Sequence, residues 1–409
     1  MASPAKMSLA LDLGTTSLAG RLLDASGNIR AAGQCVNPQN CLGKDILSRL
    51  QQCHEGHSDR LQQLLIDGLQ ELVGKLLLQA GCPAAQIEAA VAAGNPGMTY
   101  LLCGLPAAEI LYPPHLPRMR GATTLASQAL AIGLPTELQL FPLVTGFIGG
   151  DLVAFLFGLG SPQPGTVCID IGTNGELGVW TGDRWWVTSA AAGPAFEAAN
   201  VSCGMPAERG AVVDVRLTAD RLQLEVLGGP PPRGLCGSGL AALIGAGVAG
   251  GLIDRHGRIR AAEELATPLS RYLDEDGILF YRDAQARLRL SQADVRGFQL
   301  AKGALRAGLE VLLERSGLEQ DQVRQVIITG AFGQALPARA LKRVALLPED
   351  MVDKTFFVSN GVLDGLTAYL TTVDGSQRLQ KLTAALSPFP LSGTPVFEQK
   401  FLSSLDFQP

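Results

Sequence analysis

The sequence predicts an α/β protein built from two lobes, and two observations lead to this fold class. The first is a repeated pattern: residues 11–16 read Leu-Asp-Leu-Gly-Thr-Thr, and residues 169–174 read Ile-Asp-Ile-Gly-Thr-Asn. In each copy, an apolar run typical of a buried strand ends in Asp-x-Gly-Thr. The second observation is the length of 409 residues, which is too long for one compact core and fits two or three domains. A duplicated strand and turn in a chain of this length predicts two related lobes.

The composition excludes several classes of protein. Hydrophobic residues make up 47% of the chain and charged residues 17%, as is typical of a well-buried globular protein. The formal net charge is -5 and the sequence has no run of lysine or arginine, so nucleic acid is not an expected partner. The longest apolar stretches, residues 147–160 and 239–253, are shorter than the about 18 to 20 residues that a membrane span needs. Because the first ten residues lack the apolar stretch of a signal peptide, we expect a cytoplasmic protein with no membrane partner.

The cysteine pattern does not describe a metal centre. Eight cysteines are scattered along the chain without a Cys-x-x-Cys pair, which predicts reduced thiols and neither zinc nor an iron-sulfur cluster. Cys35, Cys41 and Cys53 share one polar stretch with His54 and His57. The sequence leaves open whether this group binds a metal.

The residue types of the repeated turn are suited to phosphate and magnesium. Glycine allows a sharp bend with inward N–H groups, threonine adds a hydroxyl, and a carboxylate can hold Mg²⁺ through water. We therefore predict that Asp12 and Asp170 are catalytic residues that bind Mg²⁺ through water. The predicted phosphate-binding residues of the two turns are Gly14, Thr15, Thr16, Gly172, Thr173, Asn174 and Gly175.

Each turn leads into a predicted β-hairpin. Residues 18–23 return through residues 24–28, and residues 177–180 return through Thr181-Gly182-Asp183 to residues 185–187. Trp185 and Trp186 of the second hairpin are expected in the core of their lobe. After the first hairpin, the leucine periodicity predicts a long helix with Ser58 as its N-cap and Gly81 at its end, followed by a strand over residues 86–93.

The second half of the chain ends in a further strand and turn. A Ser291 cap predicts a helix to about residue 316, followed by a strand over residues 326–329 and a helix that begins near Pro337. Between the last two lies a turn of small residues that would let a flat nucleoside approach the main chain. Its predicted nucleotide-binding residues are Gly330, Ala331, Phe332 and Gly333.

Three further positions have two interpretations each. Asp151 opens an apolar helix over residues 152–159, where it either orients the attacking water or the magnesium shell as a catalytic residue, or caps the helix. The turn of Gly237, Ser238 and Gly239 before an apolar helix suits a nucleotide anion, and equally suits tight helix packing. Glu176 is either a ligand in the metal shell or a solvated residue.

The order of these segments resembles the superfamily of acetate and sugar kinases, Hsp70 and actin. This resemblance implies two ribonuclease-H-like lobes with an interlobe cleft that holds ATP, and it places Asp12, Asp170 and Asp151 at the three acidic positions of such a site. The implied domains are a first lobe over residues 7–150 and a second lobe over residues 151–355. Residues 356–409 are expected to pack back on the first lobe.

A narrower resemblance rests on motifs distributed over nearly the whole chain. They are Asn37-Pro38-Gln39, the segment Gly43-Lys44-Asp45-Ile46-Leu47-Ser48-Arg49, Gly94-Asn95-Pro96-Gly97-Met98-Thr99, residues 169–176, Ala191-Ala192-Gly193-Pro194-Ala195-Phe196-Glu197, residues 234–240, Gln299-Leu300-Ala301-Lys302 and residues 330–333. These motifs resemble the ATPase region of reductive activators of corrinoid proteins. The resemblance implies that ATP and Mg²⁺ drive the return of a Co(II) corrinoid protein to Co(I) for a cobalamin-dependent methyltransferase. Better-known members carry an iron-sulfur domain that this sequence does not show, so a separate ferredoxin or flavoprotein is the expected electron donor, and a homodimer is the common default.

Three alternatives belong to other classes of protein. A small-molecule kinase would share the nucleotide site but would also need a sugar or carboxylate pocket. An ATP-regulated binding clamp would bind a partner protein without redox chemistry. An activator of radical dehydratases would need cysteines that bridge a dimer, and the cysteine spacing provides no such pair.

Overall fold

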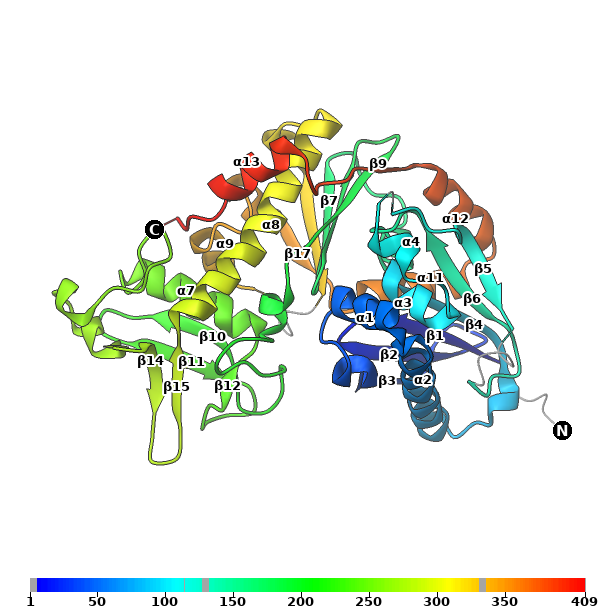
Figure 1. Ribbon diagram of the computed structural model, residues 1–409, viewed down its shortest axis with the longest axis horizontal. Helices are drawn as coiled ribbons and strands as arrows, with labels where there is room; N and C mark the ends of the chain where they lie inside the picture. Colours follow the sequence, from blue (N-terminus) through cyan, green and yellow to red (C-terminus); the bar gives the residue numbers. More distant parts are fainter. Residues whose placement is uncertain (1–5, 114, 127–131, 331–335, 409) are drawn as a thin grey trace. The chain divides into compact units, whose positions relative to one another are not determined.

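The structure of the protein is a computed structural model, and it describes residues 6–113, 115–126, 132–330 and 336–408. The chain divides into two compact units (Figure 1). Unit 1 comprises Met1–Pro162, Asp183–Trp185 and Asn360–Pro388. Unit 2 comprises Gln163–Gly182, Trp186–Ser359 and Phe389–Pro409. The domain boundaries given above stay a prediction.

Unit 1 is built on a mixed sheet with the strand order β3-β2-β1-β4-β6-β5. Its central strand β1 pairs antiparallel with β2 and parallel with β4, so the hairpin lies on one side and a parallel strand on the other. The strands are β1 (Met7–Leu13), β2 (Ser17–Asp24), β3 (Ile29–Val36), β4 (Ile87–Gly94), β5 (Gly121–Leu125) and β6 (Leu138–Leu143). The first predicted hairpin and the strand after the long helix are thus confirmed.

Helices cover both faces of this sheet. Side chains alternate between the two faces along β1, and because they are apolar on each face, both faces must be covered. Leu9 and Leu11 belong to a core formed with α2, whereas Ala10 belongs to a second core formed with α6 and α11. The helices of unit 1 are α1 (Ile46–Gln52), α2 (Ser58–Ala80), α3 (Pro96–Cys103), α4 (Ala108–Leu111), α6 (Gly150–Gly158), α11 (Gly361–Thr371) and α12 (Gly375–Ala384). Helix α11 comes from far along the chain and packs closely on α6, where a β-carbon on Gly365 would lie 1.7 Å from the carbonyl oxygen of Ala154.

The start of α2 differs from the prediction. Ser58 is the first residue of the helix and not its N-cap, because a π-helical turn over Cys53–His57 already precedes it. The Ser58 hydroxyl donates to the Cys53 carbonyl at 3.2 Å instead of capping an amide. The end of the helix is as predicted, since Gly81 adopts the left-handed conformation with φ 64° that favours glycine.

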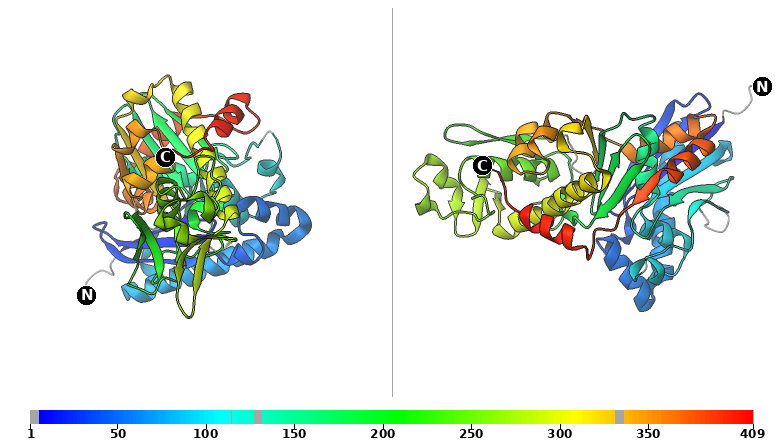
Figure 2. Two further views of the ribbon diagram at one scale, coloured as in Figure 1. Left: turned by 90° about the vertical axis from the view of Figure 1, so that its left-hand side faces the viewer. Right: turned by 90° about the horizontal axis from the view of Figure 1, so that it is seen from above.

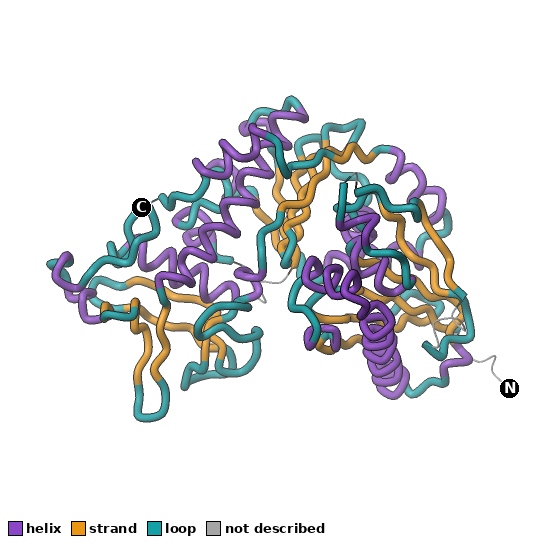
Figure 3. Tube along the Cα trace, viewed as in Figure 1, coloured by secondary structure: helices purple, strands orange, loops and turns teal. Residues whose placement is uncertain are grey.

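Unit 2 repeats this plan around β7, the strand of the second turn. Strand β7 pairs antiparallel with β8 and parallel with β16 in the order β17-β16-β7-β8-β9, and Figure 3 shows these strands in orange. They are β7 (Thr166–Ile171), β8 (Gly175–Trp180), β9 (Trp185–Ala190), β16 (Gln325–Gly330) and β17 (Thr355–Phe357). The second hairpin is confirmed, and Trp185 is buried while Trp186 packs against the core of unit 2.

In the described residues, two small sheets and five α-helices complete unit 2. The sheets contain β10 (Ala211–Leu217), β11 (Leu222–Val226), β12 (Gly234–Leu235), β13 (Leu273–Asp274), β14 (Gly277–Arg282) and β15 (Arg287–Leu290). The helices are α7 (Gly237–Ala249), α8 (Gln292–Ser316), α9 (Ala338–Arg343), α10 (Glu349–Val352) and α13 (Pro395–Ser403). Helix α8 begins with the predicted Ser291 cap, and α13 lies alongside it in both orientations of Figure 2. A further short strand, β18 (Leu386–Pro388), belongs to the part of the chain counted in unit 1.

In the described part of the chain, none of the helices combines the length and apolar character that a membrane crossing requires.

Candidate phosphate-binding turns

The first Asp-x-Gly-Thr turn lies where β1 ends beside the parallel strand β4. Asp12 pairs in register with Ala93, and Leu13 pairs with Gly94. Gly14 has no room for a side chain, since a β-carbon would lie 2.4 Å from the Ser17 carbonyl oxygen. Asp12 is half-buried and Thr16 is exposed. The carboxylate and the glycine therefore lie at the carboxyl end of a central parallel strand, where α/β proteins commonly bind ligands.

Two asparagines from other segments hold this turn in place. The side-chain amide of Asn37 donates to the Gly14 carbonyl at 2.9 Å. Asn95 donates to the Thr15 hydroxyl oxygen at 3.0 Å, and its own carbonyl oxygen caps α3 by accepting from the Met98 N–H at 2.9 Å. The buried Thr15 hydroxyl is thus part of an internal network that links the turn to the start of α3.

Arg49 is the third brace of the first turn, and its side chain is fully buried. Its guanidinium donates to the Thr15 carbonyl at 2.6 Å and to the Gly43 carbonyl at 2.8 Å. The same group donates to the side-chain oxygens of Gln39 at 3.0 Å and Asn40 at 2.6 Å. A planar guanidinium carries five donors in a fixed fork and can reach four separated acceptors, whereas an ammonium has three donors on a single atom. The sequence motifs that contain Asn37, Arg49 and Asn95 therefore act by shaping the turn.

Asp151 lies in the first turn of α6, next to the same region of unit 1. A β-carbon on Gly149, the N-cap of α6, would lie 2.6 Å from the Asn95 α-carbon and 2.8 Å from Asp151 Oδ1. Asp151 accepts a hydrogen bond from the Leu152 N–H at 2.8 Å. Burial raises its pKa to about 6, against the opposing effect of the backbone hydrogen bonds. A carboxyl group with this pKa can exchange a proton near neutral pH, so its catalytic role stays a prediction with a physical basis.

The second turn lies at the end of β7, beside the strand that leads to the predicted nucleoside segment. Thr329 of β16 pairs with Asp170 of β7. Gly330 has φ 108°, and a β-carbon there would lie 2.2 Å from the Ile171 carbonyl oxygen and 2.7 Å from Asp170 Oδ1. Any side chain at position 330 would thus collide with the acidic residue. Ala331, Phe332 and Gly333 lie outside the described residues, and their nucleotide contacts stay a prediction.

Inside the second turn, the Thr173 hydroxyl donates to Glu197 Oε1 at 2.7 Å. The N–H of Gly193 donates to the Thr173 carbonyl at 2.8 Å. Gly175 is required by packing, since its β-carbon would lie 2.0 Å from the Leu305 side chain. Glu197 is not among the site residues predicted from the sequence. It ends the motif over residues 191–197, and that motif is the sequence feature that could have indicated its role.

Two open alternatives are narrowed by the contacts within unit 2. Glu176 is buried and accepts a hydrogen bond from Ser189 at 3.2 Å, so the solvated interpretation is wrong. Ser238 is fully buried and donates to the Val213 carbonyl at 2.9 Å. A β-carbon on Gly239 would lie 1.9 Å from the Val212 carbonyl oxygen. These contacts of α7 with β10 are those of tight packing; nucleotide contacts of Gly237, Ser238 and Gly239 stay a prediction.

The cysteine and histidine stretch of unit 1 does not form a metal centre in the described residues, which contain no group of three or more His, Cys, Asp or Glu side chains suited to a metal ion. His54 instead packs edge-on against Tyr112, with ring centroids 6.0 Å apart. Burial raises the pKa of the Cys53 thiol and of the Cys35 thiol.

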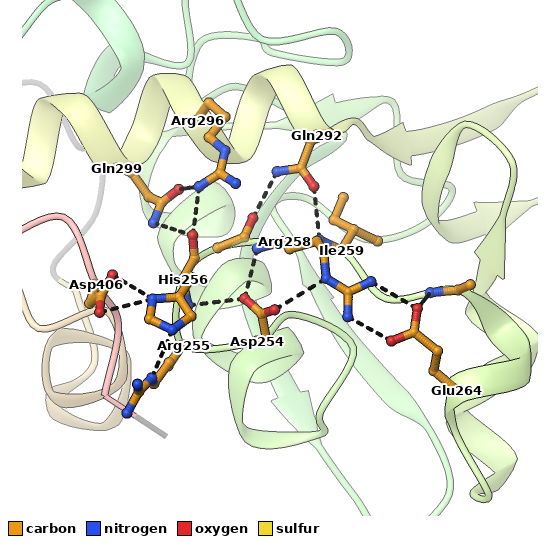
Figure 4. A network of polar contacts seen from close by, with 12 residues as sticks. Asp254, Arg255, His256, Arg258, Ile259, Glu264, Gln292, Arg296, Gln299 and Asp406 are labelled. Carbon is orange, nitrogen blue, oxygen red and sulfur yellow. Dashed lines mark hydrogen bonds and ion pairs between the residues drawn. The ribbon is translucent and has the colours of Figure 1, made fainter.

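A separate polar network in unit 2 ties the C-terminal segment to α8 (Figure 4). Gln299 donates to the His256 carbonyl at 3.1 Å and to the Leu405 carbonyl at 2.9 Å. The fully buried Lys302 donates to the Asp406 carbonyl and lies 5.1 Å from the centre of the Phe407 ring. Thus Gln299 and Lys302 of the quoted motif hold the C-terminal segment within unit 2.

The fold of the two units and their duplicated turns define an ATPase-type protein of the class that includes actin and the sugar kinases. Comparison with protein families makes this assignment specific. Residues 165–409 match the C-terminal ASKHA domain of RACo, and residues 7–160 match the RACo middle region. Because the first match alone covers more than half of the chain, the protein belongs to the RACo family, which confirms the resemblance drawn from the motifs.

Three relatives extend this assignment. The chain is 28% identical over 414 residues to the corrinoid activation enzyme RamQ of Eubacterium limosum, covering 98% of this chain and 70% of RamQ. It is 23% identical to a [Co(II) methylated amine-specific corrinoid protein] reductase of Methanosarcina barkeri, covering 83% of this chain and 65% of that protein. The solved structure of a reductive activator for a corrinoid, iron-sulfur protein matches with a TM-score of 0.88 and 28% identity, over 100% of this chain and 67% of the other. The chain thus spans about two thirds of the length of these relatives.

Proposed function

We propose that this chain uses Mg·ATP to drive the reductive activation of a corrinoid protein, returning Co(II) to Co(I) for a cobalamin-dependent methyltransferase. The observation that carries the proposal is the structural match over the whole chain to a reductive activator, at a TM-score of 0.88. The two relatives of known function also have names that describe corrinoid activation or reduction. Each unit supplies one Asp-x-Gly-Thr turn at the end of its central parallel strand.

The residues of both turns suit phosphate and Mg²⁺. A β-carbon at Gly14 or Gly330 would collide with a backbone oxygen of the same turn region, so both positions require glycine for the turn to keep its shape. Asp12 and Asp170 are the carboxylates proposed to hold the hydrated Mg²⁺, which would offset the charge of the phosphates. Thr16, Asn174 and the backbone N–H groups of both turns are proposed to contact phosphate oxygens, while Thr15 and Thr173 position the turns through their internal hydrogen bonds.

The energetic task of such an activator is to make an unfavourable electron transfer possible. The Co(II)/Co(I) couple lies below the potential of ordinary cellular donors, so binding energy must raise it. A nucleotide-bound form that binds the Co(I) protein tenfold more tightly than the Co(II) protein shifts the equilibrium by about 1.4 kcal/mol. For a one-electron couple this corresponds to about 59 mV. A few tenfold differences in affinity, supplied by ATP-dependent binding, would raise the Co(II)/Co(I) potential enough for a low-potential donor to reduce the cobalt.

We propose that the electron comes from a separate low-potential donor. The eight cysteines contain no Cys-x-x-Cys pair of the kind that commonly holds an iron-sulfur cluster. A homodimer remains part of the proposal, to be tested by the mass of the protein in solution.

The test is phosphate release from Mg·ATP with and without a Co(II) corrinoid protein from the same organism, while the cobalt spectrum is followed under a strong chemical reductant. The proposal requires that turnover increases with the corrinoid protein, and that a Co(I) band forms only with both ATP and this chain. Asp12→Asn is expected to abolish both signals, whereas Asp59→Asn, at an exposed position in the first turn of α2, is the matched control. If the rate of ATP hydrolysis does not change with the corrinoid protein and no Co(I) forms, a kinase or a binding clamp would be favoured.

A further inference from the structure

The loop that follows β9 holds the second phosphate turn through two hydrogen bonds to a single residue, Thr173. It supplies the Gly193 N–H to the Thr173 carbonyl at 2.8 Å and the Glu197 carboxylate to the Thr173 hydroxyl at 2.7 Å. A β-carbon on Gly172 would lie 3.9 Å from the same carboxylate oxygen. The half-buried Glu197 side chain therefore lies directly against residues 172 and 173 of the turn.

The core of unit 2 fixes the position of this loop. Glu197 ends a short 3-10 helix, Pro194–Glu197, whose Phe196 is fully buried. The Phe196 ring meets the Phe298 ring of α8 edge-on, with centroids 5.4 Å apart. Directly after the helix, Ala198 adopts φ 55°, and a β-carbon on Gly204 would lie 1.8 Å from its carbonyl oxygen. Because buried aromatic and backbone contacts hold the residues on either side of Glu197, its side chain meets the turn from a rigid support.

The negative charge of Glu197 favours binding of the Mg²⁺ complex of the nucleotide over the metal-free nucleotide. A carboxylate beside backbone N–H groups repels the phosphates of a metal-free nucleotide. The same carboxylate is favourable when a hydrated Mg²⁺ accompanies the phosphates, since nucleotide sites hold Mg²⁺ through one or two carboxylates together with the phosphates. Asp170, in β7, supplies one carboxylate at this turn, and Glu197, in the 3-10 helix after β9, supplies another.

We propose that Glu197 is a positioning and specificity residue of the nucleotide site, which fixes the second turn through Thr173 and makes binding depend on Mg²⁺. This inference rests on the proposed ATP-binding function. It assigns the motif over residues 191–197 a role at the second turn, comparable to that of Arg49 and Asn95 at the first.

The test measures the dissociation constants of a fluorescent ATP analogue with excess Mg²⁺ and with a chelator instead. Wild type is expected to bind the Mg²⁺ complex much more tightly than the free nucleotide. Glu197→Gln keeps a hydrogen-bond acceptor for Thr173 but removes the charge, so the ratio of the two constants is expected to fall at least tenfold. Thr173→Val keeps the charge and removes the hydroxyl; it is expected to weaken binding of both forms and to leave the ratio within about twofold of wild type.

Glu208→Gln, at an exposed position of the same unit, is the matched control and should leave both constants unchanged. Urea unfolding of each variant identifies any that fails to fold. If Glu197→Gln does, Glu197→Ala serves as the second variant, since it also removes the charge, and a wild-type ratio in that variant would overturn the inference. If Glu197→Gln keeps the wild-type ratio, the inference is overturned although the proposed function stands. If wild type binds neither form of the nucleotide, the proposed function fails and the inference falls with it.

Discussion

Replacing Arg49 by methionine is expected to destabilise unit 1 and to loosen the first phosphate turn. Methionine retains most of the buried volume, so the main loss is the set of hydrogen bonds from the guanidinium. Thr15 and Gln39 are buried, so the Thr15 carbonyl and the Gln39 side-chain oxygen lose a donor that water does not readily replace, whereas Gly43 and Asn40 are only half-buried. An unsatisfied buried carbonyl oxygen costs about 1–3 kcal/mol, so two of them give an expected loss of about 2–6 kcal/mol in the free energy of unfolding.

Two assays separate the effect on stability from the effect on the turn. Urea unfolding gives the free energy, and the dissociation constant of a fluorescent ATP analogue reports on the turn. Arg49→Lys retains the charge but cannot satisfy the same fixed acceptors, so it is expected to lose about half as much stability as Arg49→Met. Both variants should bind Mg·ATP about tenfold more weakly, which corresponds to about 1.4 kcal/mol. Arg60→Met, at an exposed position in α2, should change stability by less than about 0.5 kcal/mol.

A free energy of unfolding for Arg49→Met within about 0.5 kcal/mol of wild type, together with unchanged Mg·ATP binding, would refute this reasoning. The four hydrogen bonds would then be incidental to the turn. Lost stability with unchanged nucleotide affinity would restrict Arg49 to the core of unit 1.

Three further predictions concern other parts of the molecule. Gly365→Ala is expected to cost at least about 3 kcal/mol in urea unfolding, because its β-carbon would lie 1.7 Å from the Ala154 carbonyl oxygen, whereas Gly297→Ala in α8 meets no atom within 4 Å and should be neutral or slightly stabilising. Burial lowers the pKa of Lys302 to about 7, with Arg306 adding to the shift and Asp406 opposing it. Since the unfolded chain then binds more protons between pH 7 and its unfolded pKa of about 10.4, the lysine contributes stability that increases with pH across this range by up to about 1.4 kcal/mol per unit. Lys302→Met should remove that slope. If the free energy of unfolding depends on pH identically in wild type and in this variant, the lowered pKa of Lys302 is contradicted. With an Asp151 pKa of about 6, ATP turnover should decline below pH 6 as the carboxyl is protonated, and Asp151→Asn should be slow at every pH; a wild-type rate in that variant would leave Asp151 only the role of helix capping.

Local sequence was sufficient for the elements that satisfy their own backbone. Both hairpins, the glycine end of α2 at Gly81 and the Ser291 cap of α8 follow from turn and capping residues that act over three or four positions. Ser58 was assigned wrongly for the same local reason: serine before an apolar periodicity indicates a cap, and only the preceding π-helical turn removes the need for one.

The central strands and their turns were also visible in the sequence, because an apolar run followed by Asp-x-Gly-Thr combines burial with a required backbone shape. The partners of these turns were not visible. Arg49 and Asn95 contact Thr15 from 34 and 80 residues away, and Glu197 contacts Thr173 from 24 residues away. No periodicity connects such positions.

What the sequence by itself determined was therefore the repeated chemistry: two carboxylates, two glycine turns and the strands that carry them. Only the tertiary structure decided which side chains shape each turn and that α11 packs on α6 in unit 1. It also decided that Ser238 and Gly239 meet the backbone of β10. The physical reason is that short-range backbone preferences depend on a few neighbouring residues, whereas hydrogen bonds and close packing between distant segments exist only after the chain has brought those segments together.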